Sequence, residues 1–293
     1  MNLYLNSEKD QGLVSWTKKD YLLAAAKRLG IDSVKDIKDG QGPHDYILNI
    51  QPCVIMKGVK WTGLWHIDVS MDSDFPDQYD QVDTVFVASS VGIRPYKKQI
   101  VMFQACDPTF YYPEMEKPHD LVFCGSTTPA SLYEKRGRIY ALMKEKYQCK
   151  TDAKGKVPLD YIATISTSKI QLVQPVITKK SKYGMCAQRF FECLAIGPVL
   201  CDYTPDLEYL GLTEGEDYFS YKNDKELIEK MDKLLGSEKL RNKIAFNGRE
   251  KAIFLHSYDH RLISILNYLH KKGLRNYSAY HITMMRHSFV PIR

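Results

Sequence analysis

Arg189 and Glu192 are two side chains of opposite charge that stand three residues apart, just before an apolar run. Arg189 offers a planar guanidinium that matches the geometry of a phosphate, and Glu192 offers acceptor oxygens for the vicinal hydroxyls of a sugar. On a helix, residues three apart lie together on one face. The alternative is an exposed ion pair, which stabilises a helix by about 0.2–0.5 kcal/mol. The spacing alone favours that alternative.

The stretch that contains this pair predicts a short helix followed by a buried strand. Gly197-Pro198 ends the helix, and Val199-Leu200-Cys201 continues as the strand. We expect the helix to open after Gly184, so that its first N–H groups have no internal partner and can hold an anion. The apolar face of the helix consists of Phe190, Phe191, Leu194 and Ala195.

The pattern R-F-F-E-x-x-A-x-G, from Arg189 to Gly197, resembles the helix that binds the nucleotide sugar in GT-B glycosyltransferases. It is most similar to the CgeB-like, spore-maturation-type family. The resemblance implies that Glu192 binds the ribose of the nucleotide sugar. Gly184 stands where the large retaining families have the first glutamate of their E-x7-E pattern, so the stereochemistry of transfer stays open. Tyr183, beside it, is a candidate for stacking on the base or the sugar.

A second motif in the same chain resembles the same family. The segment A-C-D-P at 105–108, a later proline at Tyr112-Pro113, and D-L-V-F-C-G-S at 120–126 follow in the family's order. In that family the last of these is the first strand and loop of the C-terminal domain. The similarity covers residues 68–261, which is most of the chain.

Four further residues are candidates for holding the diphosphate. Gly125 and Ser126 form a tight turn that lets the backbone approach the phosphates, although a plain turn favours the same residues. Arg136 or Arg138, on the next helix, neutralises the phosphates, unless both belong to a solvated basic face. Asp72-Ser73-Asp74 has the letters of a metal motif but is interpreted as a turn, so no metal site is expected.

The N-terminal half supplies the candidates for the acceptor side. His66 and Asp68 close a strand, and an inverting transferase needs a base to take the proton of the acceptor hydroxyl. We rank Asp68 first, His66 second and Asp10 third. Asp10 and Gly12 lie in the first loop, which we assign to the acceptor side. A retaining transferase needs no strong base, and His66 would then contact the donor sugar. An ordinary strand-end histidine is the further alternative for His66.

The first half of the chain alternates apolar runs with loops and a helix, which predicts a mostly parallel sheet. The helix spans about 16–29, and the loop before it lacks the GxGxxG fingerprint of dinucleotide sites. Residues 107–119 contain three prolines and no periodicity, which indicates a linker. Strands are expected at 3–5, 44–49, 59–66, 83–88 and 99–104.

The second half repeats this alternation and ends in helices. Strands are expected at 120–123, 170–173, 199–201 and 217–220, and helices at 132–147, 208–212, 224–235, 238–254 and 259–272. The final helix ends at Gly273 and, by analogy with GT-B folds, crosses back to the N-terminal domain. We therefore divide the chain into 1–112, 113–260 and 261–293.

Composition adds the class of protein and the distribution of charge. With 44% hydrophobic and 26% charged residues and no long apolar run, the chain is expected to be a cytoplasmic protein without membrane insertion. Seven scattered cysteines indicate reduced, partly buried thiols. The net charge of +6 is concentrated at the end, because residues 236–293 carry +8. Such an end attracts phosphate-rich partners or keeps a helix solvated.

The sequence thus predicts an α/β protein of GT-B type, with two Rossmann-like domains and a cleft between them. It is expected to act as a monomeric glycosyltransferase that takes a sugar from a nucleotide sugar, with a UDP-sugar favoured and no bound cofactor. The acceptor is a hydroxyl, for example on a hydroxymethylated base in DNA, with a protein or glycan as the other choice. A sugar-nucleotide epimerase and a non-catalytic binding protein are the rival functions.

Overall fold

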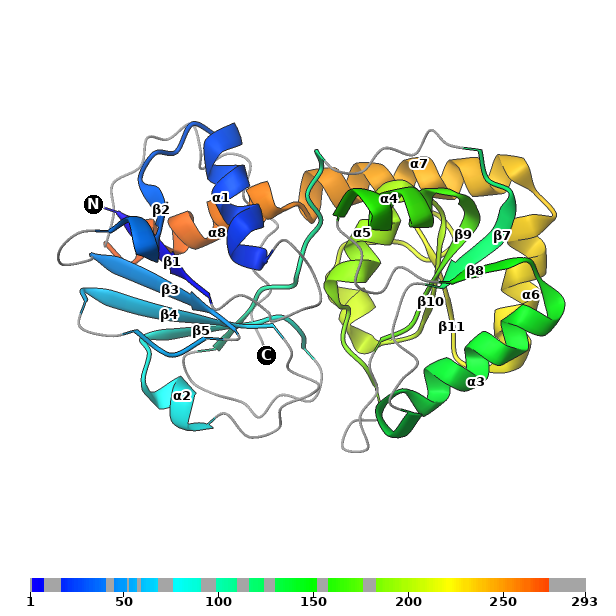
Figure 1. Cartoon of the computed structure of the whole chain (residues 1–293), viewed down its shortest axis with the longest axis horizontal. Coiled ribbons are helices and arrows are strands. Elements are labelled where there is room, and N and C mark those ends of the chain that lie inside the picture. Colours follow the sequence, from blue (N-terminus) through cyan, green and yellow to red (C-terminus); the bar gives the residue numbers. More distant parts are fainter. Residues whose placement is uncertain are drawn as a thin grey trace.

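Two parallel β-sheets, each flanked by helices, lie side by side along the molecule (Figure 1). Every strand pair in them is parallel. The predicted α/β class is therefore confirmed. The computed structural model describes residues 2–7, 17–40, 45–51, 53–56, 59–67, 76–90, 99–109, 116–123, 130–151, 158–175 and 183–273.

The first sheet has the strand order β2-β1-β3-β4-β5-β6. Its central strands are buried along almost their whole length, as expected of a parallel sheet that is covered on both faces. Helix α1 and the later helix α8 (Tyr258–Lys271) cover one face, and α2 lies on the other (Figure 1). The strands are β1 (Leu3–Asn6), β2 (Val34–Asp36), β3 (Tyr46–Ile50), β4 (Trp61–His66), β5 (Thr84–Val87) and β6 (Gln99–Val101); the helices are α1 (Lys18–Arg28), the 3₁₀ helix η1 (Ile37–Asp39) and α2 (Pro76–Asp80).

The second sheet has the strand order β11-β10-β9-β7-β8. Helices α4, α5 and α7 pack on one face of it, and α3 and α6 pack on the other. The strands are β7 (His119–Phe123), β8 (Cys149–Thr151), β9 (Ser168–Val173), β10 (Val199–Asp202) and β11 (Phe219–Tyr221); the helices are α3 (Ala130–Lys146), α4 (Pro158–Ser166), α5 (Gln188–Ile196), the 3₁₀ helix η2 (Pro205–Tyr209), α6 (Asp224–Leu235) and α7 (Glu238–Leu255).

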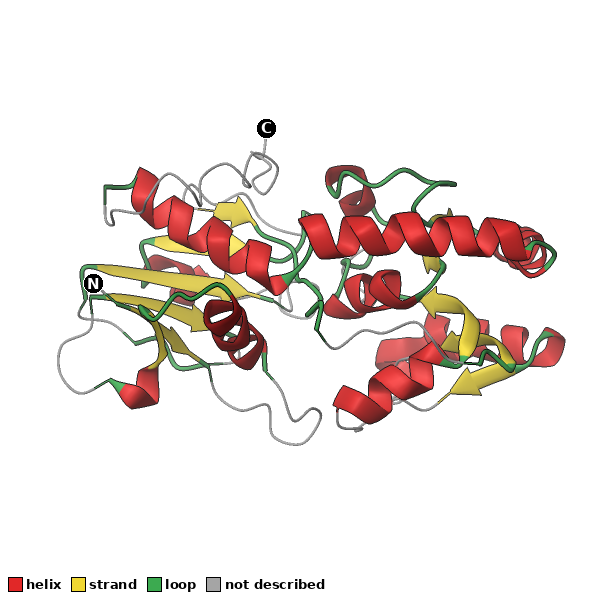
Figure 2. Cartoon of the chain, turned by 90° about the horizontal axis from the view of Figure 1, so that it is seen from above, coloured by secondary structure: helices red, strands yellow, loops and turns green. Residues whose placement is uncertain are grey.

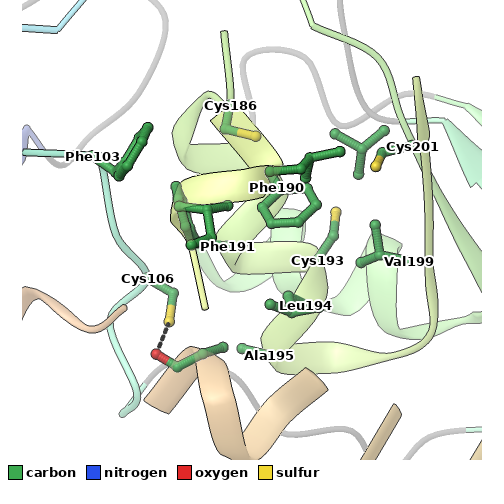
Figure 3. Packing of buried hydrophobic residues seen from close by; sticks show 14 of the residues in the cluster. Phe103, Cys106, Cys186, Phe190, Phe191, Cys193, Leu194, Ala195, Val199 and Cys201 are labelled. Carbon is green, nitrogen blue, oxygen red and sulfur yellow. Dashed lines mark hydrogen bonds between the residues drawn. The ribbon is translucent and has the colours of Figure 1, made fainter. Parts of the chain in front are cut away.

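Helix α5 is the packing centre of the second domain. The rings of Phe190 and Phe191 lie edge to face, with centroids 5.4 Å apart, within a cluster that includes the thiols of several cysteines (Figure 3). Helix α7 packs tightly against α5 at Gly248. A Cβ at that position would lie 2.6 Å from the Asp217 carbonyl oxygen and 2.7 Å from Leu194 Cδ1, so only glycine fits there.

Helices α7 and α8 follow one another along the length of the molecule, the first over the second domain and the second over the first (Figures 1 and 2). Between them, Ser257 forms a parallel bridge with Cys106, which belongs to the connection between the two sheets. The Cys106 N–H donates to the His256 carbonyl oxygen, and the Tyr258 N–H donates to the Cys106 carbonyl oxygen, both at 2.9 Å. The predicted terminal helix that crosses back to the N-terminal domain is therefore confirmed.

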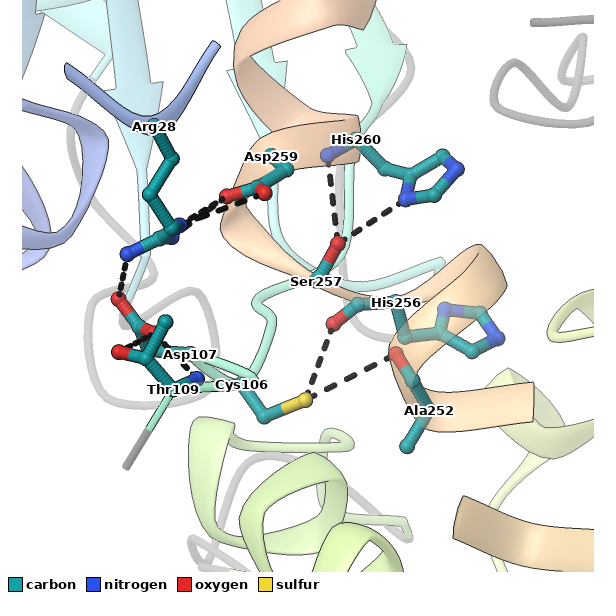
Figure 4. A network of polar contacts seen from close by, with 9 residues as sticks. All are labelled: Arg28, Cys106, Asp107, Thr109, Ala252, His256, Ser257, Asp259 and His260. Carbon is teal, nitrogen blue, oxygen red and sulfur yellow. Dashed lines mark hydrogen bonds and ion pairs between the residues drawn. The ribbon is translucent and has the colours of Figure 1, made fainter. Parts of the chain in front are cut away.

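Arginine side chains tie this crossing together. Arg261 is buried, and its guanidinium donates to the carbonyl oxygens of Phe103 (2.7 Å), Gln104 (3.1 Å) and Leu255 (3.0 Å). Nearby, Arg28 at the end of α1 donates to Asp107 (3.0 Å) on the connection and to Asp259 (2.5 Å) on α8 (Figure 4).

The differences from the sequence-based elements are local. The three-residue edge strands β2 and β8 and the short helix α2 were not predicted. The helix expected to open after Gly184 begins at Gln188, so that expectation was wrong. The strands of the first sheet end at Val101 and those of the second begin at His119. The predicted domain boundary at 112/113 falls between them, outside the described residues.

Candidate functional site

Backbone N–H groups at the start of α5 donate to side-chain oxygens from elsewhere in the chain. Ala187, its N-cap residue, makes no side-chain cap. The Gln188 N–H donates instead to Gln104 Oε1 at 3.2 Å, and the Cys186 N–H, just before the helix, donates to Asp206 Oδ2 at 2.9 Å. Some of the N–H groups that were expected to hold an anion at this helix end therefore already have acceptors within the protein.

Glu192 lies on the second turn of α5 and is only 6% exposed. Gln188, one turn earlier, donates its side-chain N–H to Glu192 Oε1 at 2.5 Å. A carboxylate in this position is too buried to form a solvated surface ion pair, so that alternative is excluded for Glu192. A buried carboxylate held by a neutral amide remains an acceptor for further hydroxyl groups.

The other predicted residues of this segment surround the start of α5. Arg189 is half-buried in the first turn, and Gly184 is buried in the segment before it. Tyr183 is half-buried, and its ring meets that of Tyr203 edge to face with centroids 5.9 Å apart. The ammonium of Lys222 lies 4.6 Å from the Tyr203 ring centroid. Two aromatic rings and a cation therefore lie together where β10 and β11 of the second sheet end.

Gln104 connects the two sets of candidate residues. Its side-chain N–H donates to the Ile67 carbonyl oxygen at 3.0 Å, directly after β4, while its oxygen accepts the Gln188 N–H of α5. Gln104 is 2% exposed. The end of the strand that carries His66 is thereby joined to the helix that carries Glu192. Sequence reasoning missed this residue, because nothing in a single glutamine signals a contact 84 positions away.

His66, at the end of β4, is buried rather than open to a cleft. It is 2% exposed, and its Nδ1 lies 2.5 Å from the Tyr79 hydroxyl on α2. Burial lowers the pKa of His66 from its ordinary 6.5 to about 4 and raises that of Tyr79 to about 12. At neutral pH His66 is thus an uncharged hydrogen-bonding group and a weak base.

Charged groups gather where the strands of the second sheet end. Asp202, the last residue of β10, is buried and paired with Lys135 of α3. Burial raises the pKa of Asp202, with the ammonium of Lys135 acting in the opposite direction. Arg136 is buried on the same helix and donates to the Gln174 carbonyl oxygen at 2.8 Å, directly after β9. Two cations of α3 therefore reach the carboxyl edge of this sheet.

Arg138 differs from Arg136 in its surroundings. It pairs with Asp224, the first residue of α6, and the side chains of the two are about half exposed, at 53% and 45%. An exposed pair of this kind contributes little to stability. The sequence left open whether Arg136 or Arg138 holds the diphosphate, and the buried Arg136 is the one fixed at the edge of the sheet.

Asp206, in η2, is a buried carboxylate that joins the two domains. It accepts hydrogen bonds from the Ser89 hydroxyl (2.8 Å), the Ser90 N–H (2.7 Å) and the Ser90 hydroxyl (2.6 Å). The two serines follow β5, and Asp206 follows β10. The carboxyl ends of both sheets therefore face the same junction, which is where open α/β sheets bind their ligands. No pattern in the sequence indicates this contact.

Five predicted site residues, Asp10, Gly12, Asp68, Gly125 and Ser126, lie outside the described residues, as do the letters Asp72-Ser73-Asp74. Within the described part of the chain, no group of three or more histidine, cysteine or acidic side chains is placed to hold a metal ion. No helix among those residues has the length and apolar composition needed to cross a membrane.

A family model described as "Glycosyl transferase-like" matches residues 127–267. No curated protein matches the chain. Solved structures resemble its fold: HepE of Anabaena, in complex with UDP, aligns with a TM-score of 0.58 at 10% identity, covering 92% of this chain and 100% of that one.

Two further structures have similar scores. Sucrose-phosphate synthase from Thermosynechococcus elongatus aligns with a TM-score of 0.54 at 13% identity, over 78% of this chain and 74% of that one. A DNA-modifying β-glucosyltransferase, solved with and without uridine diphosphoglucose, aligns with a TM-score of 0.53 at 12% identity, over 94% and 100%. These similarities confirm the GT-B fold, and the family match agrees with the predicted enzyme class. The narrower CgeB-like assignment stays a prediction.

Proposed function

We propose that this protein is a glycosyltransferase that moves a sugar from a nucleotide sugar to a hydroxyl acceptor. The nucleotide sugar, with a UDP-sugar favoured, would bind the second domain around α5 and the carboxyl edge of its sheet. The acceptor would bind from the side of the first domain. A cytoplasmic location and a monomeric state remain predictions of the sequence.

The observation that carries this proposal is the position of Glu192. It is a buried carboxylate on a helix whose N-terminus lies at the junction between the carboxyl ends of both sheets. Vicinal hydroxyls of a ribose are the donors that such an acceptor pair suits. Arg189, Tyr183 and Gly184 surround the same helix end, and Arg136 is fixed at the neighbouring edge.

The transfer assigns a role to the residues after β4. As the acceptor oxygen bonds to the anomeric carbon, the bond from that carbon to the diphosphate breaks and the acceptor proton must leave. In an inverting reaction the carboxylate of Asp68 would take this proton, because His66 is buried and bonded to the Tyr79 hydroxyl. Positive charge from Arg136, with the turn that the sequence predicts at Gly125 and Ser126, would stabilise the departing nucleoside diphosphate.

The direct test is calorimetry of nucleotide-sugar binding, followed by mass analysis of the products. Glu192→Ala is expected to weaken binding by about tenfold or more, since a hydrogen bond to a charged group contributes on the order of 1.5–3 kcal/mol. Glu229→Ala is the matched control, because this glutamate is exposed on α6 and pairs with the exposed Lys225 at a distance of 3.8 Å. Equal binding by Glu192→Ala and the parent would contradict the proposal.

Among the proposed acceptors, DNA is favoured by the net charge of +8 between residues 236 and 293. The resemblance in fold to a DNA-modifying β-glucosyltransferase supports the same choice. Each phosphate neutralised contributes about −0.9 to the slope of log K against log salt. Replacing Lys271, Lys272 and Arg275 by glutamine should therefore flatten the slope by about 2 to 3.

Salt titrations of duplex binding measure this slope in the parent and the triple variant. An unchanged slope, or a parent that does not bind DNA, would leave a protein or glycan as the acceptor. Product mass analysis separates these outcomes from an epimerase, because an epimerase alters the nucleotide sugar without consuming any acceptor.

A further inference from the structure

Gln188, the first residue of α5, contacts three different parts of the molecule. Its side-chain N–H donates to Glu192 Oε1 at 2.5 Å, and its side-chain oxygen accepts the Tyr258 hydroxyl at 2.9 Å. Its backbone N–H donates to Gln104 Oε1 at 3.2 Å. One residue therefore connects a carboxylate of the second domain to the first residue of α8 and to the connection between the sheets.

A primary amide is the group that this position requires. It presents an N–H to the carboxylate and a carbonyl oxygen to the phenol at the same time. A carboxylate at residue 188 would repel Glu192, and an apolar side chain of similar length would bond to neither partner. Tyr258 is fully buried, so water has no access to replace the lost partner of its hydroxyl.

The phenol that holds Gln188 is itself fixed by the first domain. The ring of Tyr258 stacks on that of Tyr21 of α1, with centroids 4.8 Å apart and planes 10° from parallel. It also meets Trp65 of β4 edge to face at 6.4 Å. The position of Tyr258 therefore depends on the docking of α8 against α1 and the first sheet.

We propose that Gln188 is a positioning residue for nucleotide-sugar binding: it holds the Glu192 carboxylate in place and links that place, through Tyr258 and Gln104, to the docking of the first domain. This inference rests on the proposed role of Glu192. It adds that the affinity for the nucleotide sugar depends on residues that do not touch it. Gln188 acts through Glu192 and is not a catalytic residue.

The test compares nucleotide-sugar dissociation constants by calorimetry in full-length variants, with UDP-glucose and UDP-N-acetylglucosamine as probes. Gln188→Met keeps the length of the side chain and removes both hydrogen bonds, so the dissociation constant should rise about tenfold. Tyr258→Phe removes only the hydroxyl that bonds to Gln188 and should raise the dissociation constant by a smaller factor, about threefold. In kinetics, both variants should raise KM for the nucleotide sugar more than they lower kcat.

A double-mutant cycle distinguishes positioning from a purely structural role. In a Glu192→Ala background, Gln188→Met should weaken binding less than twofold further, because the group that it positions is gone. A structural role predicts the same loss in both backgrounds. Gln171→Met is the matched control: this glutamine is fully buried in β9, its side chain donates to the Ser168 carbonyl oxygen at 3.3 Å, and its loss should lower stability without changing affinity.

Each outcome bears on the proposal. Additive losses in the cycle, or parental affinity in both Gln188→Met and Tyr258→Phe, would overturn it while leaving the role of Glu192 intact. Parental affinity in Glu192→Ala would overturn the proposed function and this inference together, since nothing would remain to be positioned. If Gln188→Met does not fold, Tyr258→Phe and its cycle with Glu192→Ala decide the question alone.

Discussion

The crossing of the terminal helices and the Asp206 contact both join the domains, and they are built from different chemistry. At the crossing between α7 and α8, Arg261 donates to backbone carbonyl oxygens, and Cys106 pairs with Ser257 as in a strand ladder. At the junction between the carboxyl ends of the two sheets, Asp206 accepts hydrogen bonds from the hydroxyl groups of Ser89 and Ser90 and from the backbone N–H of Ser90. In the first junction Arg261 thus bonds to backbone carbonyl oxygens, and in the second junction the acceptor is a side-chain carboxylate.

This difference indicates which junction can open. A buried backbone carbonyl oxygen that loses its hydrogen-bond donor costs about 1–3 kcal/mol. Pulling α8 away from the connection would remove the Arg261 donor from several carbonyl oxygens at once. Ser90 is half-buried and its hydroxyl can exchange Asp206 for water at small cost. We expect the crossing to act as the hinge and the Asp206 junction to part when ligands enter.

The largest effect is expected at the crossing. Arg261→Met keeps much of the volume of the side chain but removes the donor to three carbonyl oxygens, so the free energy of unfolding should fall by more than about 3 kcal/mol. Urea denaturation measures this change. Arg241→Met is the control, because Arg241 also donates to two carbonyl oxygens, at 2.8 and 2.7 Å, but within one domain and part-buried. A loss no larger than that of the control would mean that the crossing is not the stronger junction.

Acid should weaken the crossing next. His256 accepts from Arg261 at Nδ1 (3.0 Å) and lies 2.8 Å from the Leu210 carbonyl oxygen at Nε2, an arrangement that requires a neutral ring. Burial, with Arg261 contributing, lowers the pKa of His256 from 6.5 to about 3. Between these values the unfolded chain binds more protons than the folded protein, so stability rises with pH and is lost on acidification.

The slope tests this assignment. Denaturation midpoints from pH 6.5 to pH 4 should fall, with His256 contributing up to about 1.4 kcal/mol per pH unit. A His256→Gln variant keeps a neutral side chain and should show a shallower slope, at the expense of lower stability at pH 7. If the variant and the parent lose stability equally steeply over this range, protonation of His256 is not what weakens the crossing.

The sequence predicted the elements whose patterns are local. The apolar residues of α5 recur at helical spacing and are buried, and the glycine-proline pair ends the helix as expected. The edge strands β2 and β8, of three residues each, read VKD and CKT, which are too short and too polar to show a strand period. The burial of His66 depends on Tyr79, whose helix α2 is only five residues long.

Contacts between distant segments explain what the sequence left out of the site. Gln104 and Gln188 meet across 84 positions, and Asp206 meets Ser90 across 116, so each residue looks ordinary in its own segment. Glu192 was found because its helix carries a recognisable pattern, while the residues that hold it carry none. A pattern of residue types shows which side chain does chemistry more readily than it shows which side chain fixes it.

Asp206→Asn should have an intermediate effect. The amide keeps one acceptor oxygen but turns an N–H group toward the hydroxyls and N–H groups that Asp206 now accepts from, so we expect a loss of about 1–3 kcal/mol in stability. Small-angle scattering should show a larger radius of gyration for the variant, whereas Arg241→Met should leave it unchanged. Equal scattering profiles for the parent and Asp206→Asn would mean that this carboxylate does not hold the junction closed.

The smallest effect should come from Ser90→Ala, and it sharpens the comparison further. The variant loses the hydroxyl that donates at 2.6 Å to Asp206 Oδ1, but the backbone N–H of residue 90 still donates to the same oxygen at 2.7 Å. Because the site is half-buried, water can replace the hydroxyl, and stability should fall by about 1 kcal/mol or less. In the Asp206→Asn background the same substitution should cost almost nothing, since its acceptor has lost its charge. Urea denaturation measures this loss as well. A loss comparable to that of Arg261→Met would show that the Asp206 junction is as strong as the crossing, and would contradict the expectation that it parts while the crossing acts as the hinge.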